Sequence, residues 1–359
     1  MAYGIETMKL ITAPEDITPQ WLTNVLRSSG LLDHGTVTSL KTTGETTMLS
    51  DITRMQVHYS DDAPSCLPAR LLLKASRLNP DLKLSVGSRE IDFYSNIASH
   101  MPGAPVPRCF LAEYFDDDHY QILLEDLSET HASYSLSQIP PTETECRQIV
   151  RAIAKYQAFW WDHPELGKSI GVKPDARSIR GYCEWAQRIY PRFADFLGDR
   201  LSPGRRALYE EVLGGLERAL SKRLANQTNL TLFHGDSHIG NYLFPYDGDT
   251  ACIIDWQGWG VELGVLDLVS LMAMFWFPER RARLERPLLQ LYHQRLLAEG
   301  MPPSYSWNDC WDDYRLEILK ALFFPMSHWN MNLSPDIWWN HAERICSASV
   351  DLDCIELLR

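Results

Sequence analysis

The segment from His234 to Asn241, His-Gly-Asp-Ser-His-Ile-Gly-Asn, is the feature that most restricts how this chain can fold. The apolar run at 229–233 predicts a short buried strand before it, and the runs at 241–244 and 251–254 predict a hairpin after it. Asp255 directly follows the second of these runs. We therefore expect a loop between strands that carries polar side chains on one rim, with Asp255 returned beside them by the hairpin.

Asp236, Asn241 and Asp255 are the residue types that ATP-dependent phosphoryl transfer requires. One carboxylate orients the acceptor hydroxyl, while an amide and a second carboxylate hold Mg²⁺ on the triphosphate. Oxygen ligands suit this hard cation, and one or two from the protein suffice because phosphate and water supply the rest. The alternative interpretation is that His234 and Asp236 are loop residues that only bond to backbone groups.

This segment and the Ile-Ile-Asp-Trp sequence at 253–256 resemble the aminoglycoside phosphotransferase and choline kinase family, which is related to the protein kinases. The chain is most similar to the ecdysteroid-kinase-like branch of that family, and the resemblance runs from about Thr43 to Trp276. It implies an α+β, two-lobed, protein-kinase-like fold. In such a fold, a small mixed N-lobe with an antiparallel sheet precedes a larger, mostly helical C-lobe.

The resemblance also assigns roles to the motif residues. It implies that Asp236 is the catalytic base, that His234 supports the catalytic loop, and that Asn241 and Asp255 are the metal ligands. The segment 156–166 is similar to the family's helix before the catalytic loop, although Gln157 stands where the family often has histidine.

A single lysine, Lys74, lies within the apolar run at 69–75, which predicts a buried strand. A lone lysine in such a strand is costly to bury unless it is paired or meets a phosphate. The resemblance implies that Lys74 contacts the α- and β-phosphates of ATP and is fixed by a glutamate from the next helix. Glu90 is the candidate, because Phe93 and Ile97 follow at helical spacing and share its face. Considered separately, the two residues also fit a surface lysine and a solvated glutamate.

The strand predicted at 120–124 is followed by Glu125, Asp126 and Leu127. The resemblance implies that this is the hinge between lobes, where backbone groups near Glu125 and Leu127 bond the adenine edge. The alternative is an ordinary strand end with an acidic cap.

A phosphate-covering loop is expected at 43–52, before a strand that reaches Tyr59. It holds one glycine and lacks the glycine patterns of protein kinases and P-loop proteins. Backbone N–H groups and the hydroxyls of Thr46, Thr47 and Ser50 are the candidate phosphate contacts.

Composition fits a globular enzyme with two parts. The 359 residues, 45% hydrophobic and 23% charged, predict a nucleotide-binding N-lobe at 1–127 and a C-lobe at 128–359 with the catalytic loop, metal site and acceptor pocket. The net charge of −13 argues against a nucleic-acid partner. The eight cysteines form no C-x-x-C pair, which fits the reducing cytoplasm. The longest apolar stretch, 263–277, carries Asp267 and is too short to cross a membrane, and nothing indicates an oligomeric state.

The C-terminal part is expected to be helical. A helix should begin after Thr142, a predicted cap with Glu145 at capping-box spacing. Further helices are predicted at 179–197, 203–224, 265–277, 281–299, 307–324 and 336–358. By resemblance, Asp267 holds the catalytic loop through hydrogen bonds, and an ordinary acidic residue at a helix N-terminus is the alternative.

The acceptor is expected to be a small molecule that carries a hydroxyl. Many of the twelve tryptophans follow Asp255, and an aromatic wall there favours an apolar or cationic acceptor, with Trp259 facing the cleft. The acidic net charge points the same way. Core packing is the competing explanation for the tryptophans.

Two other functions remain open at this stage. A metal-dependent hydrolase is the first, with His234, Asp236 and His238 as ligands; it leaves Lys74 and Asn241 without a role. The second is a non-catalytic ATP-binding protein on the same fold, since a fold does not determine a function. The retention of the polar site residues favours a kinase that uses ATP and Mg²⁺.

Overall fold

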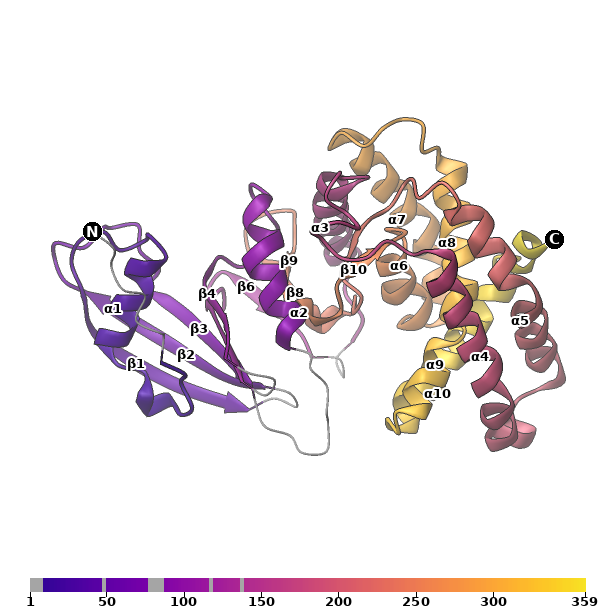
Figure 1. Cartoon of the computed structure of the whole chain (residues 1–359), viewed down its shortest axis with the longest axis horizontal. Coiled ribbons are helices and arrows are strands. Elements are labelled where there is room, and N and C mark those ends of the chain that lie inside the picture. Colours follow the sequence, from indigo (N-terminus) through magenta and orange to yellow (C-terminus); the bar gives the residue numbers. More distant parts are fainter. Residues whose placement is uncertain (1–8, 47–49, 77–86, 116–118, 136–138) are drawn as a thin grey trace. The chain divides into compact units, whose positions relative to one another are not determined.

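The computed structural model describes residues 9–46, 50–76, 87–115, 119–135 and 139–359 (Figure 1). The chain forms two compact units. The first contains 1–133, 245–247 and 252–258, and the second contains 134–244, 248–251 and 259–359. The predicted boundary after Leu127 lies six residues before the end of the first segment. The segment with Asp255, which we had placed in the second part, belongs to the first unit.

The first unit is built on a five-stranded antiparallel sheet with strand order β1-β2-β3-β5-β4. The strands are β1 Val37–Thr46, β2 Ser50–Tyr59, β3 Arg70–Ser76, β4 Cys109–Tyr114 and β5 Tyr120–Glu125. Strand residues alternate between faces, so Leu71 and Leu73 of β3 enter the core beside helix α1, Pro19–Ser28, while Lys74 points to the opposite face. Helix α1 is not among the elements predicted from the sequence.

A helical segment follows β3 in the chain. It begins as α2, Gly87–Asp92, and continues as one π-helical turn, Phe93–Ile97, and a 3₁₀ turn, Ala98–His100. The ring of Trp256, in the 3₁₀ turn Trp256–Gly258, stacks on Phe93 with centroids 3.8 Å apart. The remaining strands and turns of the first unit are the 3₁₀ turn Pro14–Asp16, β6 His131–Ser133 and β9 Cys252–Ile253.

The second unit is mostly helical (Figure 1). Helix α3, Glu143–Trp160, begins with the predicted capping box between Thr142 and Glu145. The other helices are α4 Ala176–Leu197, α5 Pro203–Leu224, α6 Leu266–Leu268, α7 Pro278–Ala298, α8 Trp307–Ala321, α9 Phe324–Asn330 and α10 Pro335–Asp351. Shorter turns are Gly198–Arg200, Ile239–Asn241, the π-helical turn η7 Val269–Met274 and Cys354–Leu358. Strands β7, Thr231–Phe233, and β10, Gly260–Glu262, pair antiparallel, and β8 is Tyr242–Pro245.

The fold class is confirmed: the chain has an antiparallel sheet in its smaller part and helices in its larger part. Three predicted elements are wrong in detail. The predicted helix 307–324 ends at Ala321, because Pro325 lies in the first turn of the next helix, α9, which begins at Phe324. The predicted helix 336–358 breaks at Asp353, whose backbone is left-handed. The region 265–277 is one short α-helical turn followed by the π-helical turn η7.

The expected phosphate-covering loop is also different. Its first part, Thr43 to Thr46, belongs to β1 and pairs with 51–54 of β2, so these residues form a strand pair. Thr47 lies outside the described residues. Within the described part of the chain, no helix is long and apolar enough to span a membrane.

Candidate active site

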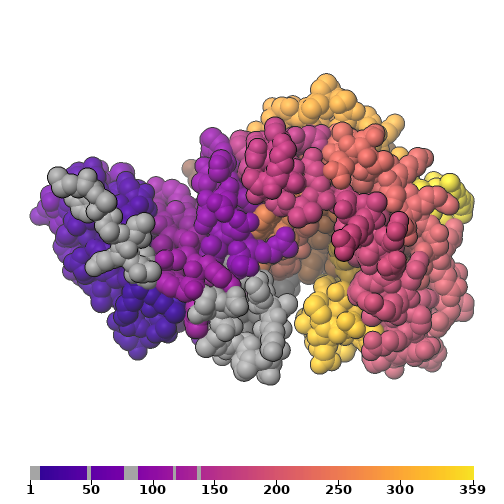
Figure 2. Space-filling view, viewed as in Figure 1, coloured from indigo at the N-terminus to yellow at the C-terminus, as the bar shows by residue number. Residues whose placement is uncertain are grey.

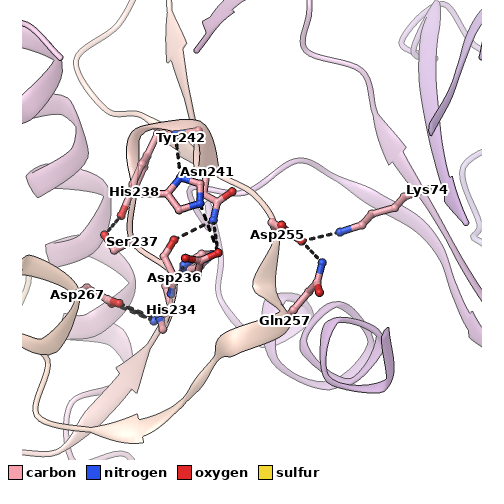
Figure 3. A network of polar contacts seen from close by, with 12 residues as sticks. Lys74, His234, Asp236, Ser237, His238, Asn241, Tyr242, Asp255, Gln257 and Asp267 are labelled. Carbon is pink, nitrogen blue, oxygen red and sulfur yellow. Dashed lines mark hydrogen bonds and ion pairs between the residues drawn. The ribbon is translucent and has the colours of Figure 1, made fainter. Parts of the chain in front are cut away.

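The first unit brings Lys74, Glu90 and Asp255 together. The Nζ atom of Lys74 lies 2.6 Å from Oε2 of Glu90 and 2.6 Å from Oδ1 of Asp255; Figure 3 shows the contact with Asp255. Strand β3 supplies the lysine, because its alternation directs Lys74 away from the core. Helix α2 supplies the glutamate, and the buried side chains of Phe93 and Ile97 lie on the same helix face, as predicted.

These three charged groups form a largely buried site with one cation and two carboxylates. The side chains of Lys74 and Glu90 are 10% and 1% exposed. Desolvation acts to lower the pKa of Lys74, but the carboxylates of Glu90 and Asp255 outweigh it and raise that pKa above its usual value. Lys74 therefore remains a cation throughout the neutral range, as a group that binds phosphate must.

Asp255 has an unusual backbone conformation. Its φ angle of 65° lies in the left-handed region, which costs free energy for a residue other than glycine. The carboxylate accepts from Lys74 and from the side-chain amide of Gln257 at the same oxygen, Oδ1 (Figure 3). A strained residue held by two side chains is typical of a functional position.

The other predicted nucleotide residues lie at the ends of strands. Ser50 is the first residue of β2 and is buried. Glu125 ends β5, and its carboxylate pairs with Arg108, Nε to Oε2, at 3.0 Å. The carbonyl of Leu127 accepts from the backbone N–H groups of Thr130 and His131, both at 3.0 Å, so this carbonyl is already used in a turn.

In the second unit, the loop after β7 places Asp236 and Asn241 in direct contact. The Nδ2 atom of Asn241 donates to the backbone carbonyl of Asp236 at 2.8 Å and to its Oδ2 at 3.1 Å (Figure 3). Only an NH₂ group donates to two acceptors, so the geometry fixes the amide orientation. It leaves the Oδ1 of Asn241, an oxygen suited to a hard cation, turned away from these two acceptors.

The carboxylate of Asp236 is 54% exposed and lies 3.4 Å from Nε2 of His238. Desolvation acts to raise its pKa, but His238, His234 and the amide of Asn241 outweigh it and lower that pKa below the ordinary value. Asp236 is therefore ionised at neutral pH and exposed to solvent. The predicted base thus has the charge that its role requires.

Asp267 holds this loop in place through hydrogen bonds. Its carboxylate accepts from the backbone N–H of His234 at 2.9 Å and of Gly235 at 3.0 Å. It also accepts from the hydroxyl of Tyr156 and from Nε2 of Gln157, the latter at 3.1 Å. The prediction that Asp267 holds the loop through hydrogen bonds is confirmed, with α3 supplying the other two donors.

Gln157 links this anchor to the rest of the second unit. Its amide also donates to the carbonyl of Gly264 at 2.9 Å, and its Oε1 accepts from the hydroxyl of Tyr292. A Cβ atom at Gly264 would lie 2.5 Å from the Tyr292 hydroxyl, so only glycine fits there. The sequence marked Gln157 as a departure from the family pattern but did not reveal these partners, since Tyr292 is 135 residues away.

The two histidines of the motif do not form a metal site with Asp236. The Nδ1 of buried His234 accepts from the N–H of Asp236 at 3.2 Å, and the Nδ1 of His238 accepts from the N–H of Gly240 at 3.1 Å. Among the described residues, no group of three or more His, Cys, Asp or Glu side chains could hold a metal ion. The geometry thus gives the hydrolase interpretation no support.

Trp259 does not face a cleft. It is 3% exposed and packs near Gly171 and Val261, so the expectation that it lines the acceptor site is wrong. Trp256, Trp276 and Trp338 are also buried and pack in the hydrophobic core. Instead, the ring of His238 contacts Phe275, directly after η7, and Phe275 contacts His341 of α10.

Solved structures show the same fold. A Ralstonia eutropha protein assigned to the aminoglycoside phosphotransferases matches with a TM-score of 0.57 and 14% identity, over 94% of this chain and 98% of that one. A choline/ethanolamine kinase family protein from Mesorhizobium loti matches with a TM-score of 0.50 and 13% identity, over 90% and 93% of the two chains. No curated protein sequence is significantly similar to this chain.

Sequence similarity to a family model covers more than half of the chain. Residues 67–305 match the model described as the phosphotransferase enzyme family. That range includes Lys74, the loop with Asp236, and Asp267. The chain therefore belongs to the phosphotransferase enzyme family, and it is a phosphotransferase that acts on a hydroxyl group.

Proposed function

We propose that the protein is an ATP-dependent small-molecule kinase that transfers the γ-phosphoryl group of ATP to a hydroxyl of its acceptor. The observation that carries this proposal is the environment of Asp236. Its ionised, exposed carboxylate lies on a loop that Asp267 and Asn241 fix through hydrogen bonds. Positioning is what a loose phosphoryl-transfer transition state mainly needs.

Asp236 acts by orientation first and as a proton acceptor second. A carboxylate with a lowered pKa is a weak base, and it does not remove the proton of a free alcohol before transfer begins. It accepts a hydrogen bond from the hydroxyl and points the oxygen lone pair at the γ-phosphorus. The proton moves to Asp236 as the new O–P bond forms, because the alcohol then becomes strongly acidic.

Lys74 binds the α- and β-phosphates, and Glu90 keeps its ammonium group in place. The buried ion pair and the raised pKa of Lys74 support this role. The hydroxyl of Ser50, at the start of β2, contacts a phosphate group of ATP. Backbone groups near Glu125 and Leu127 form hydrogen bonds with the adenine edge. The engaged carbonyl of Leu127 restricts its contribution to the N–H group.

Asn241 and Asp255 are the ligands that we propose for Mg²⁺. The amide orientation of Asn241 presents a carbonyl oxygen, and Asp255 presents a carboxylate. The ion supplies charge neutralisation on the triphosphate, and few protein ligands suffice for it. Asp255 should matter more than Asn241, since it carries the charge.

A non-catalytic ATP-binding protein is the remaining alternative. It gives no role to the exposed carboxylate of Asp236, which does not contact the nucleotide in the proposed arrangement. Transfer of phosphate from ATP to an acceptor distinguishes the two functions, because only the kinase catalyses it.

The test compares Asp236→Asn with the wild type. The variant should fold and bind Mg·ATP almost normally but lose about 10²-fold or more in kcat, the usual scale for loss of a general base. Asp247→Asn makes the same change at an exposed turn residue and should leave kcat unchanged. Near-normal turnover by Asp236→Asn, measured by phosphate incorporation in a screen of small alcohols, contradicts the proposal.

A further inference from the structure

Aromatic and basic side chains from three segments gather beside Asp236 in the second unit. We call His238, Phe275, His328, His341 and Arg344 the histidine–arginine cluster. The ring of His238 lies 5.6 Å from that of Phe275, which lies 4.7 Å from His341, which in turn lies 5.7 Å from His328. Arg344 lies three residues after His341 on α10. The α9–α10 segment, yellow in Figure 2, reaches the surface of this unit.

Arg344 is a half-buried cation without a carboxylate partner among the described residues. Its guanidinium lies 4.5 Å from the ring of Phe277, and Nη1 donates to the carbonyl of Met274 at 3.4 Å. Its Nε is buried and has no hydrogen-bond acceptor in the described part of the chain. Desolvation lowers the pKa of this arginine. A desolvated charge without a counter-charge is costly, and an anionic ligand would remove that cost.

His328 and His341 add hydrogen-bonding capacity without adding charge. The Nδ1 atoms of both rings are buried and lack a partner within the described residues, and His341 is 6% exposed. Desolvation lowers the pKa of both histidines, and for His341 the charges of His328, Arg344 and His238 bring that pKa to about 4. Both rings are therefore neutral near pH 7, and each has one N–H to donate.

The charge around the cluster does not follow the acidic net charge of the chain. The carboxylate of Asp236 acts on both His328 and His341, and its hydroxyl-orienting role occupies it. A cationic acceptor would be repelled by Arg344, which has no carboxylate partner in the part of the chain that the structure describes. The cationic part of our expectation of an apolar or cationic acceptor, which rested on the late tryptophans and the net charge of −13, is therefore not supported at this place.

We propose that the acceptor is a hydroxy acid, whose carboxylate is bound by Arg344 and His341 while its hydroxyl is directed to Asp236. This inference rests on the proposed kinase function. A monoanion fits better than a phosphate dianion, because one guanidinium balances one charge and the γ-phosphate already brings negative charge to the site. The ring of Phe275 packs against an apolar part of the acceptor between its two polar ends.

The experiment uses benzoate, benzamide and benzylamine as probes of the same size with charges of −1, 0 and +1. Each is titrated into the full chain with Mg·ADP, and the imidazole resonances of His328 and His341 are followed by NMR, assigned with His328→Gln and His341→Gln. Benzoate should shift both resonances to saturation, and benzylamine should not. Arg344→Gln should weaken benzoate binding by about tenfold to a hundredfold, the scale of a hydrogen bond to a charged group.

Arg192→Gln is the matched control. It removes the same charge from an exposed arginine that lies over the ring of Trp329, and it should leave benzoate affinity unchanged. Preferential binding of benzylamine, no binding of benzoate, or equal loss in both variants overturns the inference.

Transfer to 4-(hydroxymethyl)benzoate, its amide and the corresponding benzylamine separates this inference from the proposed function. Faster Asp236-dependent phosphorylation of the amine than of the acid refutes the hydroxy-acid acceptor and leaves the kinase function intact. If the wild-type protein binds no Mg·ADP, or shows no ATP-dependent transfer at all, the proposed function itself is refuted.

Discussion

Replacing Asp267 with asparagine tests how the catalytic loop is positioned. Four donors converge on this carboxylate: the N–H groups of His234 and Gly235, the hydroxyl of Tyr156 and the amide of Gln157. Asp267→Asn keeps the shape but leaves one oxygen to accept and introduces an NH₂ group that faces donors. The hydroxyl of Tyr156 can rotate to accept from it. The amide of Gln157 cannot turn without losing its bonds to Gly264 and Tyr292.

The expected loss of stability follows from the number of donors that Asp267→Asn leaves without an acceptor. One unsatisfied donor in a fully buried site costs about 1–3 kcal/mol, and losing the charge on the bonds to the loop costs a similar amount. We expect the free energy of unfolding to fall by roughly 2–5 kcal/mol. A shift of the loop by about 1 Å is enough to reduce kcat by about 10²-fold, while the KM for ATP should change little, because Lys74 belongs to the other unit.

Urea unfolding and steady-state kinetics measure the two effects. Asp162→Asn is the matched control, since that exposed carboxylate also accepts two backbone N–H groups, of Asn229 at 2.9 Å and Leu230 at 3.1 Å, just before β7. It should cost less than about 1.5 kcal/mol and leave kcat unchanged. If Asp267→Asn retains wild-type kcat, or if both variants lose kcat equally, the positioning role is refuted.

Three further predictions concern other parts of the site. Lys74→Met should raise the KM for ATP and lower kcat without changing the affinity for adenosine. Glu90→Gln should have the same effects more weakly, because the lysine charge remains. If a binding assay shows that the affinities for adenosine and for ATP fall equally, the phosphate contact is contradicted. The lowered pKa of His341, about 4 against 6.5, means that the unfolded chain binds more protons in this window, so stability present above pH 6.5 is lost as the pH falls towards 4. That loss is on the order of 2–3 kcal/mol, and thermal unfolding of His341→Gln should show a flatter pH dependence over the same range. Gly264→Ala should lower the free energy of unfolding by about 1–3 kcal/mol, because its Cβ would lie within 3.0 Å of the Tyr292 hydroxyl, of Gln157 Oε1 and of Thr231 Cγ2; an unchanged urea midpoint in this variant would exclude that cause.

Local sequence signals predicted much of the fold. The capping box at Thr142 and Glu145 marked the start of α3, because both residues act within one helical turn. The apolar run around Lys74 placed β3, and the helical spacing after Glu90 placed the buried face of the helical segment that begins with α2. These patterns depend on neighbours along the chain, which a sequence displays directly.

Contacts between distant segments were beyond the reach of such signals. The bond from Tyr292 to Gln157 joins residues 135 positions apart, and no periodicity encodes it. Trp259 was placed in the acceptor site because it follows Asp255 closely, whereas it is buried beside Gly171. The net charge likewise suggested a cationic acceptor, although charge averaged over the whole chain says little about the surroundings of His341 and Arg344.

A ribosome completes Ser133 long before it reaches Gly258, although both belong to the first unit. At ordinary elongation rates, the residues from 134 to 258 take roughly 6 to 25 seconds to add. During that interval the nascent chain has no carboxylate from Asp255 for Lys74 and no indole from Trp256 to cover Phe93. The sheet can begin to form early, but the unit matures only after most of the chain has been synthesised. A gene fragment that stops at Ser133 should therefore yield an incompletely folded chain that binds chaperones, and not an isolated nucleotide-binding unit.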